Sequence, residues 1–180
     1  DEEQMKKLWN RTLNARGETI FDKPSFRSAA RHSRCIIYVD GFYEHHHYKG
    51  KTYPFFIFAK DQRPLALAGL YSEWKNPETN GHFLTFSIVT SIGNLMMKRI
   101  HNNPKLSEPR MPFILSSEYE DKWLKEAEDD VDLQAIQEMI QEFPEEELKA
   151  YTVGKLRGKE YIGNIKTISD EVHYPDLVLE

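Results

Sequence analysis

The chain has 180 residues and a mass of 21.2 kDa, with 39% hydrophobic and 29% charged residues. This composition is typical of one globular domain, so it excludes a collagen, a coiled coil and a wholly disordered chain. The single cysteine excludes internal disulfides and a cysteine-rich zinc site, and it fits a reducing compartment. No apolar run is long enough to span a membrane and no signal-peptide pattern opens the chain, so we expect a soluble intracellular protein with a single domain over 1–180.

Charge is distributed unevenly along the sequence. The net charge of −5 at first argues against a nucleic-acid partner. Residues 1–117, however, hold 17 Lys and Arg against 11 Asp and Glu, a balance of +6. Residues 118–147 hold 2 basic and 13 acidic residues, a balance of −11, and 148–180 are neutral. Nearly all the net negative charge therefore lies in residues 118–147. The total charge does not exclude DNA as a partner of the other residues.

Short runs rich in β-branched and aromatic residues predict strands along most of the chain. They cover 35–39, 53–58, 65–71, 83–89, 111–115 and 151–153. Turn signals stand at 40–41, 61–64 and 76–81, and 14–19 is typical of a turn that leads into a helix. Leu95, Met96 and Ile100 predict a short helix after Thr90.

The acidic block predicts two surface helices with a solvated acidic face. Ser117 and Glu120 form a capping-box pattern, and Pro144 marks the expected end of the second helix. Apolar residues recur between them at helical spacing, namely Ile136, Met139, Ile140 and Phe143. Because the strands precede the helices without regular β–α–β alternation, we predict an α+β fold: a mixed, mostly antiparallel sheet with a barrel-like core and peripheral helices.

The segment 40–47 carries the most reactive-looking side chains. Glu44 follows a glycine turn and two aromatic residues, and partial desolvation of such a carboxylate suits it to proton transfer; the alternative is an exposed glutamate at a strand end. In a strand, His45 and His47 face one way and His46 the other, so the three cannot readily bind one ion. We therefore expect no metal site, and a histidine-dependent metallohydrolase is the weakest alternative.

Two further clusters contain groups suited to binding or catalysis. The first is the stretch 14–19, where Asn14 can orient a reacting group and Arg16 offers a planar fork for phosphate. The second comprises Thr90 to Asn94, then His101 and Arg110. Each is also compatible with an ordinary turn or a solvated loop. Cys35 lies inside an apolar strand run, where a thiol is usually packed rather than reactive.

In this order, the clusters resemble the SOS response-associated peptidase (SRAP) family, whose members bind abasic sites in single-stranded DNA. The resemblance spans about residues 8–124. The matching stretches are 14–19, 34–44, 67–71 with Trp74, Thr90 with Asn94, 100–101 and 110–115.

The resemblance implies a covalent chemistry. In this family the residue after the initiator methionine is a cysteine, and its α-amine and thiol condense with the aldehyde of a ring-opened abasic deoxyribose. An imine forms first and closes to a thiazolidine, which shields the lesion as a DNA–protein cross-link. The family name also reflects a proposed self-processing peptidase activity. Abasic single-stranded DNA is the implied partner of a cytoplasmic protein (nucleoid-associated if bacterial), with no cofactor, no membrane association and a monomer favoured.

The resemblance also implies residue roles. Glu44 matches the glutamate that shuttles protons, His101 the histidine that assists opening of the sugar ring, and Asn14 the asparagine that orients the reacting groups. DNA contacts are implied for Arg16, Thr90, Arg110 and His45.

Three differences from the family pattern have consequences. The sequence starts at Asp1 without the family's Cys-Gly-Arg, so we expect the nucleophile to lie upstream and 1–180 to be the larger part of a domain. His45 stands where the family usually has tryptophan, and residues 102–109 are inserted between His101 and Arg110. The alternative function is a non-covalent module that binds single-stranded DNA without catalysis.

Overall fold

The computed structural model describes residues 9–76, 79–105 and 107–179. Contacts divide the chain into two compact units, each assembled from three separate segments. Unit 1 comprises Asp1–Tyr38, Ala66–Ser91 and Pro112–Glu142, and unit 2 comprises Val39–Leu65, Ile92–Met111 and Phe143–Glu180. The chain thus alternates between the units, and residues distant in sequence come together within each of them.

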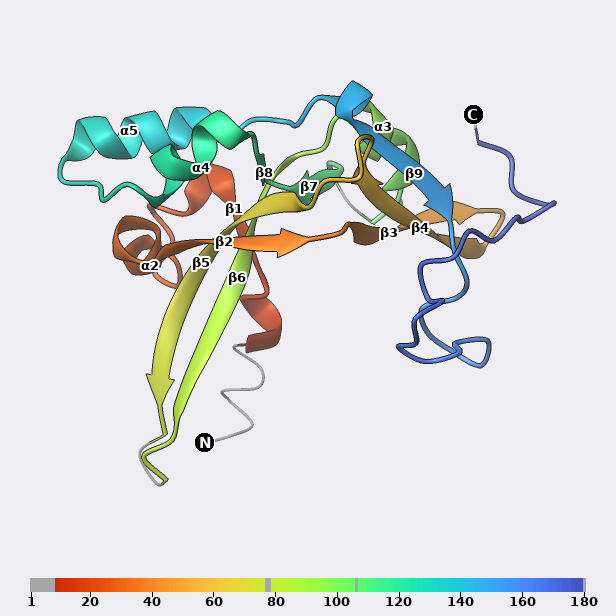
Figure 1. The fold of residues 1–180 in the computed structure, drawn as a ribbon, viewed down its shortest axis with the longest axis horizontal. Helices are drawn as coiled ribbons and strands as arrows, with labels where there is room; N and C mark the ends of the chain where they lie inside the picture. The colour runs from red at the N-terminus through yellow and green to blue at the C-terminus, as the bar shows by residue number, and fades with distance from the viewer. Residues whose placement is uncertain (1–8, 77–78, 106, 180) are drawn as a thin grey trace. The chain divides into compact units, whose positions relative to one another are not determined.

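A six-stranded sheet lies mainly in unit 1 (Figure 1). Its order is β1-β6-β5-β2, while β7 pairs with β6 and β8 with β5. The pairing of β1 with β6 is parallel, whereas β5 is antiparallel to both β6 and β8. The strands are β1 (Asn14–Arg16), β2 (Arg34–Val39), β5 (Leu65–Lys75), β6 (His82–Ile92), β7 (Arg110–Pro112) and β8 (Ile114–Leu115).

The core of unit 1 joins this sheet to α2 (Arg27–His32), α4 (Ser117–Leu124) and α5 (Asp130–Met139). Trp123 of α4 is completely buried, and its indole N–H donates to the carbonyl of Cys35 over 2.9 Å. Burial of such a side chain stabilises the fold by about 2–3 kcal/mol, and the hydrogen bond removes the cost of enclosing the indole nitrogen. The acidic α4 is thereby attached to β2.

The two acidic helices exist, but their ends differ from the prediction. The N-cap of α4 is Ser116, and its side chain makes no cap hydrogen bond, so the predicted capping box of Ser117 and Glu120 is wrong. The N-cap of α5 is Asp129, whose side chain accepts the backbone N–H groups of Val131 and Asp132. That helix ends at Met139, well before Pro144, so the proline does not terminate it.

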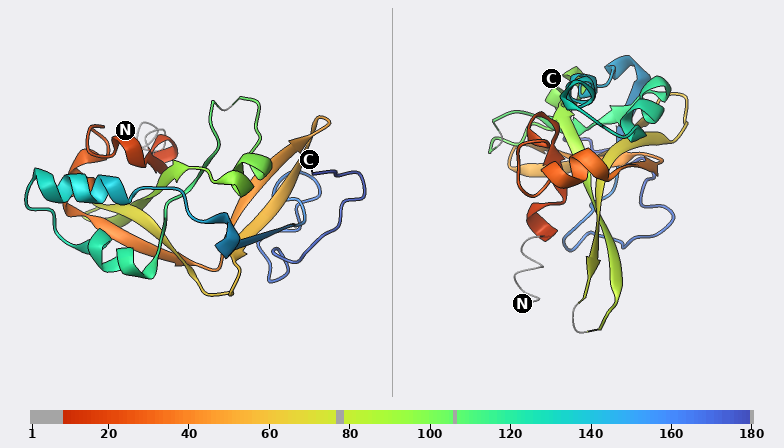
Figure 2. Two further views of the ribbon diagram at one scale, coloured as in Figure 1. Left: turned by 90° about the horizontal axis from the view of Figure 1, so that it is seen from above. Right: turned by 90° about the vertical axis from the view of Figure 1, so that its left-hand side faces the viewer.

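Unit 2 contains a three-stranded antiparallel sheet with the order β3-β4-β9. Its strands are β3 (Phe42–Tyr48), β4 (Lys51–Ala59) and β9 (Leu148–Thr152), and the β3–β4 hairpin is orange in Figure 2. Lys49 and Gly50 both have positive φ, 46° and 74°, as a two-residue hairpin turn requires. Beside β3 packs α3 (Leu95–Ile100), which begins at the N-cap Asn94.

The predicted fold class is confirmed, with mixed, mostly antiparallel sheets accompanied by short helices. All six predicted strand ranges coincide with strands, except that 111–115 divides into β7 and β8 around Phe113. The predicted turn at 76–81 falls partly on residues 77 and 78, which lie outside the described residues. In the described part of the chain, no helix has the length and apolar character needed to cross a membrane.

Candidate functional site

Glu44 and His101 form a close acid–base pair in unit 2. The Oε2 atom of Glu44 lies 3.4 Å from Nδ1 of His101, and their side chains are 24% and 17% exposed. Glu44 comes from β3, while His101 is the C-cap residue of α3. The pair is shielded from most solvent but still accessible, as a group that exchanges protons with a substrate needs to be.

Local sequence explains how Glu44 is presented. A Cβ atom at Gly41 would lie only 2.4 Å from the carbonyl oxygen of Ile57, so a glycine is needed where the chain enters β3. β3 is an edge strand of the described sheet, and the N–H of His45 is accepted by Oε1 of Glu44 over 2.8 Å. The carbonyl of Pro54, the residue opposite His45 on β4, accepts the N–H of Val153 instead. The carboxylate thus satisfies a backbone donor and is oriented by it.

The tautomer of His101 follows from its neighbours. Its Nδ1 lies 3.1 Å from the carbonyl oxygen of Arg110 as well as 3.4 Å from the carboxylate of Glu44. Both neighbours are acceptors, so Nδ1 carries the proton. The other nitrogen, Nε2, is then the one able to accept or donate a proton during a reaction. Despite the inserted residues 102–109, the backbone of Arg110 remains in contact with His101.

His45 follows Glu44 on β3 and has a perturbed titration. Burial lowers the pKa of its imidazole, and the positive charge of Arg157 lowers it further, with smaller effects from His47 and Lys155. The ring is therefore neutral at pH 7. A neutral imidazole offers a flat surface that can stack on a base without carrying charge.

The remaining predicted residues lie together in unit 1. Arg16 and Thr90 are register partners in the parallel β1–β6 pair, and Asn14 is two residues away on β1. Thr90 Oγ1 donates to the carbonyl of Ala15 over 3.4 Å, while Asn14 and Arg16 are exposed. A Cβ at Gly17 would lie 3.1 Å from the carbonyl oxygen of Thr90, so glycine permits the close approach after β1. The predicted residues thus form two groups, one in each unit.

Sequence reasoning assigned no role to His46 or Asn102, although both bond the elements that carry the pair. His46 Nδ1 bonds the carbonyl of Arg99, and Asn102 bonds the backbone of His47. Strand alternation signalled that His46 faces away from its neighbours. Nothing in the sequence signalled Asn102, because its partner lies 55 residues away.

Other potentially reactive features do not contribute to this site. Burial raises the pKa of the Cys35 thiol, which disfavours the nucleophilic thiolate. No group of three or more His, Cys, Asp or Glu side chains that could hold a metal ion occurs among the described residues.

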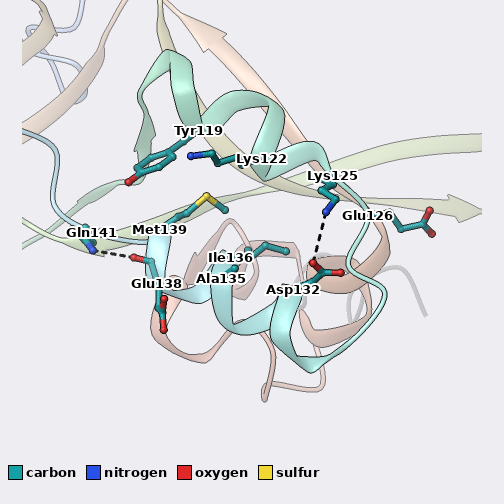
Figure 3. A pocket seen from close by; sticks show the side chains of 10 residues that line it. All are labelled: Tyr119, Lys122, Lys125, Glu126, Asp132, Ala135, Ile136, Glu138, Met139 and Gln141. Carbon is teal, nitrogen blue, oxygen red and sulfur yellow. Dashed lines mark hydrogen bonds and ion pairs between the residues drawn. The ribbon is translucent and has the colours of Figure 1, made fainter.

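A cavity of about 480 Å³ opens between α4 and α5 in unit 1 (Figure 3). Lys125 and Asp132 face each other across it, 3.9 Å apart. None of the predicted site residues is among its lining side chains, which are Tyr119, Lys122, Lys125, Glu126, Asp132, Ala135, Ile136, Glu138, Met139 and Gln141.

Comparisons with known proteins give this geometry a family context. The family model described as SOS response associated peptidase (SRAP) matches residues 2–159. The chain belongs to the SRAP family. It is 38% identical over 151 residues to the abasic site processing protein YoqW of Bacillus subtilis, which covers 83% of this chain and 63% of that protein. It is 30% identical over 116 residues to the abasic site processing protein YedK of Escherichia coli, which covers 63% of this chain and 47% of that protein.

Solved structures of this SRAP fold agree with the sequence comparison. A crystal structure of a Bacteroides thetaiotaomicron protein matches with a TM-score of 0.82 and 31% identity, over 96% of this chain and 71% of the other. A Bordetella bronchiseptica protein matches with a TM-score of 0.67 and 26% identity, over 78% and 64% of the two chains. The chain spans somewhat less than two thirds of the length of YoqW, 63%.

Proposed function

We propose that this SRAP protein processes abasic sites in single-stranded DNA and that Glu44 and His101 move the protons. The observation that carries the proposal is the shielded carboxylate–imidazole pair, with 3.4 Å between Oε2 and Nδ1. Its context is a family model over residues 2–159 and relatives named abasic site processing proteins. The substrate class is DNA whose sugar has opened to an aldehyde.

The proposed reaction is a condensation without a redox step or a cofactor. The α-amine of an N-terminal cysteine attacks C1′ of the open sugar, and the resulting carbinolamine loses water to give an imine. The thiol sulfur then adds to the imine carbon while the thiol proton passes to nitrogen, which closes the thiazolidine. That nucleophile is not among these 180 residues, since Cys35 has no free α-amine. In this proposal the full-length gene product supplies it from upstream of Asp1.

The described residues supply proton transfer and binding in this scheme. Glu44 takes a proton from the attacking amine and returns it to the departing hydroxyl, and His101 assists ring opening through Nε2. Asn14 orients the reacting groups. Arg16, Thr90 and Arg110 contact the DNA backbone, and neutral His45 stacks against a base. We propose that the protein acts as a monomer in the cytoplasm, at the nucleoid in a bacterium, and that self-cleavage exposes the cysteine.

Single substitutions in the pair test the site. In the full-length gene product, Glu44→Gln and His101→Ala are each expected to slow cross-linking to abasic single-stranded DNA by about 10²-fold, because each removes an acid–base group. The measurement is the time course of a DNA–protein band on a denaturing gel. Glu73→Gln and His82→Ala are matched controls, because these residues form an exposed Glu–His ion pair in unit 1. Equal rates for all four variants would refute the assignment.

A non-covalent module that binds single-stranded DNA is the second candidate. It is favoured by one observation, namely that the single cysteine of these 180 residues is half-buried and has a raised thiol pKa. The two candidates differ in whether their complex with DNA survives denaturation. A complex that is visible on a native gel but dissociates under denaturing conditions identifies the module, whereas a species that survives denaturation identifies the cross-linking protein.

A further inference from the structure

One amide side chain bonds the open edge of β3. Asn102 Oδ1 accepts the backbone N–H of His47 over 2.6 Å, and Asn102 Nδ2 donates to the carbonyl of His47 over 2.9 Å. These are the two hydrogen bonds that a residue of a neighbouring strand would make. Asn102 lies two residues beyond the last residue of α3, so its side chain ties the end of this helix to β3.

A second bond joins the same two elements from the buried face of the strand. His46 is 6% exposed, and its Nδ1 lies 2.9 Å from the carbonyl oxygen of Arg99. A carbonyl only accepts, so Nδ1 is the donor. The other ring nitrogen lies 3.5 Å from Nδ2 of Asn102, which is a donor. The imidazole thus contacts the last turn of α3 on one side and the residue beyond the helix on the other.

These bonds hold the chain on both sides of His101, one member of the acid–base pair. His101 lies in the chain between Arg99, which His46 holds, and Asn102, which holds His47. Glu44 stands two residues before His46 on the same strand. The contact between the end of α3 and β3 therefore fixes the positions of both Glu44 and His101. The separation of 3.4 Å between them depends on how α3 packs against β3.

We infer that Asn102 and His46 are positioning residues that set the Glu44–His101 separation. Neither touches the reacting atoms; each acts through the placement of His101. The expected effect on the reaction rate rests on the proposed function. The claim that Asn102 and His46 set the Glu44–His101 separation does not. A side chain that only stabilised its own loop would leave the separation unchanged when removed.

The geometric part is tested without DNA. Asn102→Ala is expected to accelerate hydrogen exchange of the His47 amide by about tenfold, because that amide loses its acceptor. A crystal structure of the variant is expected to show Glu44 Oε2 and His101 Nδ1 farther apart than 3.4 Å. Asn103→Ala is the matched control, since the Asn103 side chain accepts from the N–H of Lys105 within its own loop. An unchanged separation in folded Asn102→Ala overturns the inference.

The catalytic part is tested by single-turnover cross-linking of the full-length gene product at saturating abasic DNA. Asn102→Ala is expected to lower the rate by about 10- to 100-fold while the Kd for DNA changes by less than about twofold, because misplacement affects the reaction more than binding. His46→Leu should lower the rate similarly, and His46→Asn, which keeps a donor near the Nδ1 position, should restore much of it.

An unchanged rate in Asn102→Ala overturns the catalytic part if Glu44→Gln slows the reaction. If Glu44→Gln is also unaffected, the proposed function fails, and the structural experiment alone decides whether Asn102 and His46 set the Glu44–His101 separation.

Discussion

At the residue scale, adjacent side chains on β3 have different environments. Glu44 accepts a backbone N–H and faces His101, whereas His45 is half-buried among positive groups. Alternation along the strand separates them, because neighbouring residues point to opposite faces. One short segment can thereby offer a proton-transfer group on one side and a neutral ring on the other.

The titration of His45 is a direct test of this environment. Burial and the charge of Arg157 lower the pKa of the imidazole, so we expect an NMR pH titration to find its midpoint below that of an ordinary histidine. Arg157→Gln should raise that midpoint. Since the unfolded chain takes up the proton at higher pH, the His45 contribution to the free energy of unfolding falls as the pH drops through the ordinary histidine range.

The control for this titration is Arg63→Gln. Arg63 is another exposed arginine of unit 2, but it pairs with Glu147 over 2.9 Å and does not influence His45. A midpoint at or above the ordinary value, or a rise of equal size in both variants, would contradict the assigned cause of the lowered His45 pKa.

The sequence could single out Glu44 and His101 as candidate residues, but it could not predict their contact. Their residue types and order are visible in the chain, whereas the 3.4 Å approach depends on the packing of α3 against β3. Asn102 shows the same limit more clearly. An asparagine in an inserted loop has many possible partners, and the backbone of His47 becomes its partner only after the strand and helix have assembled.

At the element scale, most strands were predictable because β-branched and aromatic residues recur along them, even in β6, where Phe83, Leu84 and Phe86 stay exposed. Helix ends were less predictable. Ser117 has the capping-box spacing to Glu120, but the N-cap residue is Ser116, and its side chain makes no cap hydrogen bond. Helical spacing also continues to Phe143, which is buried although it lies beyond the end of α5. Its burial comes from tertiary packing in unit 2, which local periodicity does not encode.

The N-cap of α5 gives an element-scale prediction. Asp129→Ala is expected to lower the free energy of unfolding by about 1 kcal/mol, because the backbone N–H groups of Val131 and Asp132 both lose their acceptor. Urea denaturation followed by circular dichroism measures the change. Glu128→Ala removes the same charge one residue earlier and keeps the cap, so it should have a smaller effect. Equal losses in the two variants would show that charge, and not capping, stabilises this end.

At the scale of the whole molecule, the distribution of charge matters more than its sum. The net charge is −5, but residues 1–117, which carry all the predicted site residues, balance at +6. The acidic residues are concentrated on α4, α5 and the turn that follows them. A DNA substrate is therefore electrostatically compatible with the site-bearing part of the chain, whatever the overall pI.

We propose that an abasic site, and not DNA in general, is the substrate. The most direct measurement mixes the full-length gene product with two single strands of identical sequence, one containing an abasic site and one intact, and resolves the products on a denaturing gel. We expect a DNA–protein species with the abasic strand only. The same yield with both strands, or no such species from folded protein with the abasic strand, would contradict it.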